Sequence, residues 1–232
     1  SVPTSTRTPL PATTPTRTLV ATATPIYSPT PTTTAANTPT ATATLPASGQ
    51  QLVLQQGLDG YDGVRDTYLN GWDANTNYEP STDLRCRTDG MRNSILRFDL
   101  SRVPAGAQIT QATLSIYVST ASPNPIWLEV YRVLRPWEPT QATWLRAREG
   151  SSWIAPGCDY PGQDRAATYS ATAYLSRAQA SYDMDITAVM QMWVSDPGTN
   201  YGILLKGSGA SSTEYTLASS NHWGTAWRPK LT

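Results

Sequence analysis

The chain has 232 residues, and its 17 basic and 17 acidic side chains give a formal net charge of zero at neutral pH. This balance excludes a strong electrostatic attraction to nucleic acid. No apolar run approaches the roughly 20 residues that a membrane-spanning helix requires. We therefore expect neither a nucleic-acid partner nor a membrane span.

The composition divides the chain near Gly49. Residues 1–48 contain 17 Thr, 9 Pro and no acidic residue, whereas all eight Trp and both Cys follow Gly49. Each proline fixes its own φ and pushes the preceding residue toward extended backbone. We predict an extended Thr/Pro-rich arm over residues 1–48, and a folded domain over residues 49–232 that is long enough to bury its own core.

The arm has the low-complexity composition of O-glycosylated stalks. No Asn in the chain precedes an x-Ser or x-Thr pair, so we expect any covalent glycan to be O-linked. The predicted acceptors are the densest run of threonines in the arm, namely Thr30, Thr32, Thr33, Thr34, Thr38, Thr40, Thr42 and Thr44.

One segment of the arm, residues 19–27, differs from the rest because it holds the larger apolar side chains Leu19, Val20, Ile26 and Tyr27. This segment is β-prone and could add a strand to an exposed sheet edge of a neighbouring subunit. The alternative is a chance cluster within a flexible linker, and the sequence alone leaves both interpretations open.

Period-two alternation predicts strands in the domain. Leu96, Phe98 and Leu100 alternate with polar residues, and the same pattern continues over residues 112–118. Further strands are expected at residues 51–55, 82–87, 128–134, 181–186, 202–206 and 213–218. Many short strands joined by Gly/Pro turns predict an all-β fold, a jelly-roll β-sandwich.

One short helix interrupts this pattern. It is expected to be capped by Thr187 and to stop at residues 196–198, where the sequence reads Asp-Pro-Gly. Val189 and Trp193 stand four residues apart and therefore share one face of this helix. We expect Trp193 to belong to the core.

The two cysteines, Cys86 and Cys158, stand in a chain with few lysines and a Thr/Pro-rich arm. This context suggests export and a disulfide, which would close a loop of about 70 residues and contribute on the order of 4 kcal/mol. Two buried free thiols are the alternative.

The sequence holds few residues suited to catalysis. His222 is the single histidine, so no catalytic triad is expected, and one His with two Cys cannot form a standard structural zinc site. Asp183 and Asp185 are the nearest carboxylate pair, but their spacing places both on the solvent face of a strand. We predict that the protein is not an enzyme and carries no cofactor.

Three aspartates near the start of the domain are candidate ligands for a calcium ion. Asp59, Asp62 and Asp66 could supply oxygen ligands, although their spacing is not that of an EF-hand loop. As turn-forming residues they need no ion, and this reading is favoured.

Several motifs in order carry a family resemblance. They include Asp66-Thr67-Tyr68, the alternating stretches at 94–100 and 112–118, the Trp-containing stretches at 135–137, 142–144 and 153–160, and the segments 185–189, 200–206 and 228–232. Together they resemble the DNRLRE domain, also classed as a family 96 carbohydrate-binding module. The resemblance implies an extracellular β-jelly roll without catalysis, in which Trp137, Trp144 and Trp153 pack around a long loop.

Two tryptophans stand apart from these packing positions. Trp72 follows Asn70-Gly71, and Trp223 lies in a Gly/Ser-rich loop. Both are candidates for exposed side chains that contact glycan.

Three functions follow from these features. The first is a structural subunit of an extracellular O-glycosylated filament, assembled from copies of this chain by docking of the arm on neighbouring subunits. The second is a carbohydrate-binding module on a mucin-like linker, with a polysaccharide as its partner. The third is a cell-surface adhesin or stalk. All three place the protein outside the cell or at its surface.

Overall fold

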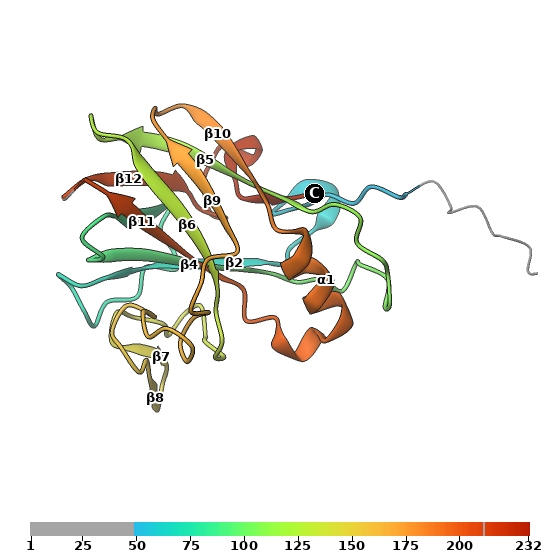
Figure 1. Ribbon diagram of the computed structural model, residues 1–232, viewed down its shortest axis with the longest axis horizontal. Coiled ribbons are helices and arrows are strands. Elements are labelled where there is room, and N and C mark those ends of the chain that lie inside the picture. Colours follow the sequence, from blue (N-terminus) through green and yellow to red (C-terminus); the bar gives the residue numbers. More distant parts are fainter. Residues whose placement is uncertain (1–48, 211) are drawn as a thin grey trace, which may run out of the picture. The chain divides into compact units, whose positions relative to one another are not determined.

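The computed structural model describes residues 49–210 and 212–232 (Figure 1). The predicted arm lies outside the described residues. So do its docking residues Leu19, Val20, Ile26 and Tyr27 and the threonines between Thr30 and Thr44. These expectations stay predictions.

The described residues form two antiparallel sheets and a small hairpin. One sheet has six strands: β1 (Leu54–Gln55), β3 (Asp83–Arg87), β5 (Thr113–Ala121), β10 (Ala180–Asp185), β12 (Glu214–Ala218) and β13 (Lys230–Leu231). The other has five: β2 (Val64–Asn70), β4 (Arg92–Phe98), β6 (Ile126–Arg132), β9 (Ala171–Leu175) and β11 (Ile203–Gly209). The hairpin consists of β7 (Arg146–Arg148) and β8 (Ser151–Ser152).

From β2 to β6, and again from β9 to β12, consecutive strands alternate between the two sheets. This repeated crossing is typical of jelly rolls. The predicted all-β sandwich with one short α-helix is confirmed.

Alternating side chains explain why the two sheets face each other. On β5, Leu114, Ile116 and Val118 are fully buried, whereas Tyr117 between them points to the outer face. On β4, Leu96 and Phe98 face inward to the same core. A strand that buries every second residue must pack one face against another layer, and here the partner layer is the second sheet.

A second apolar cluster lies on the outer face of the five-stranded sheet. It joins Leu69, Ile95 and Leu204, which point away from the sandwich core, to Trp137 and Trp153. These tryptophans belong to the excursion 134–166, which carries β7 and β8 and lies on the opposite side of β4 from β5 and β10 (Figure 1). The predicted packing of tryptophans around a long loop is confirmed, with Trp144 partly buried against the same cluster.

The helix α1 (Thr187–Ser195) ends directly before Asp196, as expected, and Trp193 is buried in the core with 2% of its surface exposed. The predicted cap is wrong, because Thr187 is the first residue of α1 and the N-cap position is Ile186, which has no polar side chain. The backbone N–H of Thr187 donates instead to Asp185 Oδ1 at 2.8 Å. Short 3₁₀ turns form at η1 (Leu58–Gly60), η2 (Pro197–Thr199) and η3 (Thr225–Trp227). No helix in the described part of the chain is long and apolar enough to cross a membrane.

The predicted disulfide is wrong, because Cys86 and Cys158 are both free, buried thiols. Cys86 belongs to the core between the two sheets, where its Sγ lies 3.3 Å from the carbonyl oxygen of Leu205. Cys158 belongs to the outer cluster with Trp137 and Trp153. The five-stranded sheet lies between the two cysteines, so the fold keeps them apart.

Candidate functional site

Trp223 is the most exposed large apolar side chain among the described residues, with 74% of its surface accessible. It lies in the loop between β12 and η3, at one end of the six-stranded sheet. A single exposed apolar side chain is common, whereas a contiguous group of exposed apolar side chains marks an interaction surface, so the neighbours of Trp223 decide its meaning. Its predicted exposure is confirmed, and its prediction as a glycan contact is the starting point for the site.

Trp223 does not stand alone, because two rings support it. The ring of Trp227 packs edge-on against Trp223 with centroids 4.8 Å apart, and His222 lies 5.1 Å away at an angle of 31°. Trp227 in turn stacks almost parallel on Tyr117, with centroids 5.0 Å apart and 6° between the planes. We name this group, Tyr117, His222, Trp223 and Trp227, the first aromatic surface.

The loop that carries His222 and Trp223 is anchored by three sets of hydrogen bonds. Ser220 donates both its backbone N and its Oγ to the buried carboxylate of Asp66, at 2.7 and 3.1 Å. Asn221 Nδ2 donates to the carbonyl oxygen of Glu79 at 2.6 Å, and Arg228 Nε donates to that of His222 at 2.8 Å. The exposed ring therefore stands on a fixed loop.

Burial governs the electrostatics of this anchor. It raises the pKa of Asp66 from 3.8 to about 7, against the opposing effect of the two hydrogen bonds from Ser220. The nearby negative charge of Glu79 raises the pKa further. Asp66 thus gains and loses its proton near neutral pH while it holds the loop.

Trp72 is also exposed, at 55%, but its ring is already in contact with charged groups. The guanidinium carbons of Arg87 and Arg92 lie 5.0 and 4.7 Å from its centroid, which is cation–π distance. Arg92 is held in turn by both carboxylate oxygens of Glu214, at 2.6 and 2.7 Å. Because its ring is already engaged by these two arginines, Trp72 is not included in the candidate glycan site.

The three aspartates that could supply ligands for calcium are not brought together as a ligand set. Asp66 is buried and bonded to Ser220, whereas Asp62 is exposed and accepts from Gln56 Nε2 at 2.6 Å. Asp59 lies in the 3₁₀ turn η1 with a φ of 48°. Among residues 49–210 and 212–232, no group of three or more His, Cys, Asp or Glu side chains could hold a metal ion.

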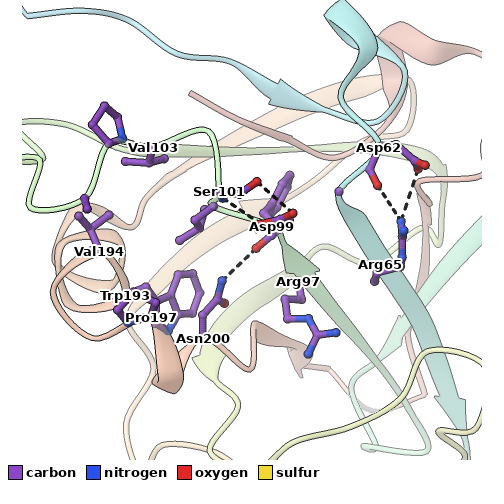
Figure 2. Close-up of a pocket in the computed structure, with 15 residues that line it drawn as sticks. Asp62, Arg65, Arg97, Asp99, Ser101, Val103, Trp193, Val194, Pro197 and Asn200 are labelled. Atoms are coloured by element: carbon purple, nitrogen blue, oxygen red, sulfur yellow. Dashed lines mark hydrogen bonds and ion pairs between the residues drawn. The ribbon is translucent and has the colours of Figure 1, made fainter.

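A cavity of about 630 Å³ opens beside the start of β2 and the end of β4 (Figure 2). Arg65 and Arg97, paired across these strands, line it together with Asp62, Asp99 and Asn200. Asp99 accepts hydrogen bonds from Ser101 N and Oγ, at 2.8 and 3.2 Å, as in an ordinary turn. The hydrogen bond from Gln56 and the charge of Arg65 lower the pKa of Asp62, so this carboxylate is not suited to act as a general acid.

The other carboxylate pair, Asp183 and Asp185, is exposed on β10 as expected. Asp183 accepts a hydrogen bond from Ser115 Oγ at 2.5 Å, and Asp185 accepts one from Thr187 N at the start of α1, at 2.8 Å. The interaction with Thr187 lowers the pKa of Asp185. Both side chains have structural partners, and the prediction that the protein is not an enzyme stays a prediction.

Sequence reasoning missed two members of the first aromatic surface. Alternation on β5 placed Tyr117 on the outer face, but no pattern indicated that a ring would cover it. Trp227 lies in η3 beside Gly224, where a Cβ atom would come within 2.6 Å of the Trp227 ring. The sequence Trp223-Gly224-x-x-Trp227 could have signalled this close approach of backbone to ring.

These features define a class: an all-β sandwich with an anchored aromatic surface. Within it, the chain belongs to the disaggregatase related repeat domain family, whose model matches residues 72–232. No curated protein matches the sequence significantly.

This family assignment overturns the resemblance to the DNRLRE domain and the family 96 carbohydrate-binding module. The motifs behind that prediction include residues 94–100 and 112–118, which contribute to β4 and β5. Their alternation is what any half-buried strand of a sandwich requires. It therefore indicates the fold and does not distinguish one sandwich family from another.

Proposed function

We propose that the domain is a non-catalytic glycan-binding module of an extracellular or cell-surface protein. The observation that carries this proposal is the 74% exposed ring of Trp223, held on a loop that buried hydrogen bonds fix in place. A rigid aromatic ring can stack on the apolar face of a pyranose without first losing conformational freedom. Binding without chemistry fits a surface whose polar neighbours are engaged in holding the loop.

The proposed location outside the cell is supported by the composition of the arm and not by the cysteines. Two free thiols remove the disulfide argument for export, whereas the Thr/Pro-rich stretch of residues 1–48 still has the composition of an O-glycosylated stalk. The location outside the cell is therefore part of the proposal.

The test is affinity electrophoresis and calorimetry of the full chain against a panel of polysaccharides. We expect at least one polysaccharide to bind, and Trp223→Ala to weaken that binding about tenfold or more, as for a central aromatic contact. Trp72→Ala is the matched control and should leave the affinity unchanged. Equal affinities for wild type and Trp223→Ala would contradict the proposed site.

The filament hypothesis stays a second proposal, since its docking segment lies outside the described residues. The family description as a repeat domain supports a module used in series, although it names no assembly. Electron microscopy of the native material tests it. Fibres of regular repeat would support it, whereas monodisperse single molecules would overturn it. Anchoring of one end at a cell envelope would favour the adhesin or stalk.

A further inference from the structure

A second pair of exposed aromatic rings lies on the outer face of the five-stranded sheet. Trp127 on β6 and Tyr174 on β9 stand directly opposite each other in the strand register, and each has 49% of its surface exposed. Their centroids are 5.0 Å apart, with 56° between the planes. Ile126 and Leu128, on either side of Trp127, are buried in the core, so the outward direction of the Trp127 ring is fixed by the sheet.

A carboxylate stands beside this pair. Glu129 follows Trp127 by two residues on β6 and therefore shares its face. Ser208 Oγ donates to Glu129 Oε1 and Tyr131 Oη donates to Oε2, both at 2.7 Å. Burial and the interaction with Glu129 raise the pKa of Tyr131 to about 12, so this hydroxyl keeps its proton and remains a donor.

The two donors orient the Glu129 carboxylate and leave part of its hydrogen-bond acceptor capacity free. A carboxylate has about four acceptor positions, and Ser208 and Tyr131 occupy one on each oxygen. About two acceptor positions are left for hydroxyl groups that approach from outside. Lys206, which faces Glu129 across the register, forms its ion pair with Asp159 instead. Glu129 therefore has no ion-pair partner among residues 49–210 and 212–232.

We propose that Trp127, Tyr174 and Glu129 form a second glycan-binding surface, whose ligand is a neutral, hydroxyl-rich polysaccharide. The two rings stack on the apolar faces of sugar rings, and Glu129 accepts hydrogen bonds from sugar hydroxyls, the donors that such a ligand offers. The uncompensated negative charge of Glu129 repels the carboxylates of acidic polysaccharides. Selectivity for neutral chains follows from this charge.

The two aromatic surfaces face opposite sides of the sandwich. Tyr117, a member of the first aromatic surface, points outward from the six-stranded sheet, and Trp127 points outward from the five-stranded sheet. One domain can therefore hold two polysaccharide chains at once and link them. This linking rests on the proposed function of the first surface, whereas binding at the second surface does not.

The experiment uses the full chain and two kinds of probe. Xylan, mixed-linkage β-glucan and galactomannan are the neutral polysaccharides, and polygalacturonate is the acidic one. Affinity is measured by calorimetry and linking by light scattering of dilute polysaccharide. Trp127→Ala, Tyr174→Ala and Glu129→Gln each change the second surface, and Trp72→Ala is the matched exposed-tryptophan control. Circular dichroism confirms that each variant is folded.

We expect wild type to bind a neutral polysaccharide at two sites and to raise its scattering. Trp127→Ala and Tyr174→Ala should abolish the increase in scattering. Each should lower the affinity of the second surface about tenfold or more and leave binding at the first aromatic surface. Glu129→Gln should weaken neutral binding and strengthen binding of polygalacturonate. Trp72→Ala should behave as wild type.

The outcomes separate the two proposals. Unchanged neutral binding in Trp127→Ala, Tyr174→Ala and Glu129→Gln would overturn the second surface, whatever Trp223→Ala does. Loss of binding in these variants but not in Trp223→Ala would support the second surface and contradict the first. A wild type that binds only polygalacturonate, or none of the four polysaccharides, would overturn the inference.

Discussion

Asp66 and Ser220 are 154 positions apart in the sequence, yet the carboxylate of Asp66 accepts both the backbone N–H and the hydroxyl of Ser220, at 2.7 and 3.1 Å. This contact ties β2 in the five-stranded sheet to the loop that follows β12 in the six-stranded sheet. It therefore couples the position of Trp223 to the closure of the sandwich.

The first prediction concerns the pH dependence of this contact. Burial raises the pKa of Asp66 to about 7, against 3.8 for an ordinary carboxyl. As pH rises, the unfolded chain loses this proton first, so the contribution of Asp66 to stability falls between about pH 4 and 7 and then levels off. Asn keeps an acceptor for Ser220 N and cannot ionise. Between pH 4 and 8, wild type should lose up to about 4 kcal/mol of unfolding free energy relative to Asp66→Asn.

Urea denaturation at several pH values measures this difference. Asp183→Asn, at an exposed carboxylate on β10, is the control and should follow the wild-type profile. Parallel profiles for wild type and Asp66→Asn would show that Asp66 does not change its proton affinity on folding.

The second prediction concerns the two thiols. Cys86 and Cys158 are buried and free, and burial raises the pKa of the Cys86 thiol to about 12 and that of Cys158 well above its ordinary value. Thiolates are the reactive form, so neither should react with Ellman's reagent in the native protein. In urea without reductant, two thiols per chain should react. Fewer than one reactive thiol per chain in urea would show that Cys86 and Cys158 form a disulfide after all.

The third prediction concerns the outer cluster. Trp137 is fully buried, and its Nε1 donates to the carbonyl oxygen of Tyr201 at 2.7 Å. Trp137→Ala should cost about 3–5 kcal/mol of unfolding free energy, because it opens a cavity between the excursion 134–166 and the sheet and leaves that carbonyl without its donor. Trp137→Phe should cost less, since it keeps most of the packing. A loss below about 1 kcal/mol for Trp137→Ala in urea titrations would mean that the excursion does not unfold together with the sandwich.

The sandwich was predictable because alternation reports burial directly. The expected strands at residues 82–87 and 213–218 match β3 and β12 within one residue. The expected stretch 112–118 begins one residue before β5 and ends three residues before its last residue. β2 and β9 were missed. On β2 five consecutive residues are buried, since its outer face lies against other parts of the chain, and this hides the period of two.

The candidate site was only partly predictable. Exposure of Trp72 and Trp223 followed from their Gly-containing loops, but the arginines around Trp72 come from β3 and β4, and no local pattern indicates that contact. The pair of Trp127 and Tyr174 depends on the register of β6 with β9, strands separated by the whole excursion 134–166. Long-range register is set by packing, so sequence neighbours do not reveal it.

The last prediction concerns Gly224, where the loop backbone lies against Trp227. A Cβ atom at this position would come within 2.6 Å of Cε3 of the Trp227 ring, which is closer than real contacts allow. Because φ is −80°, alanine suffers no backbone strain, and the effect should come from the ring alone. Gly224→Ala should therefore displace the Trp227 ring, which packs against Trp223. The displaced ring should no longer hold Trp223 in place, and glycan binding at the first aromatic surface should weaken.

Calorimetry with the polysaccharide that binds best and tryptophan fluorescence measure the effect of Gly224→Ala. Gly49→Ala is the matched control, since a Cβ atom there meets nothing within 4 Å. Binding at the second surface should persist in Gly224→Ala, because Trp127 and Tyr174 lie on the other sheet. If Gly224→Ala binds and fluoresces as wild type, the ring of Trp227 does not position Trp223, and exposure alone would account for any binding by that side chain.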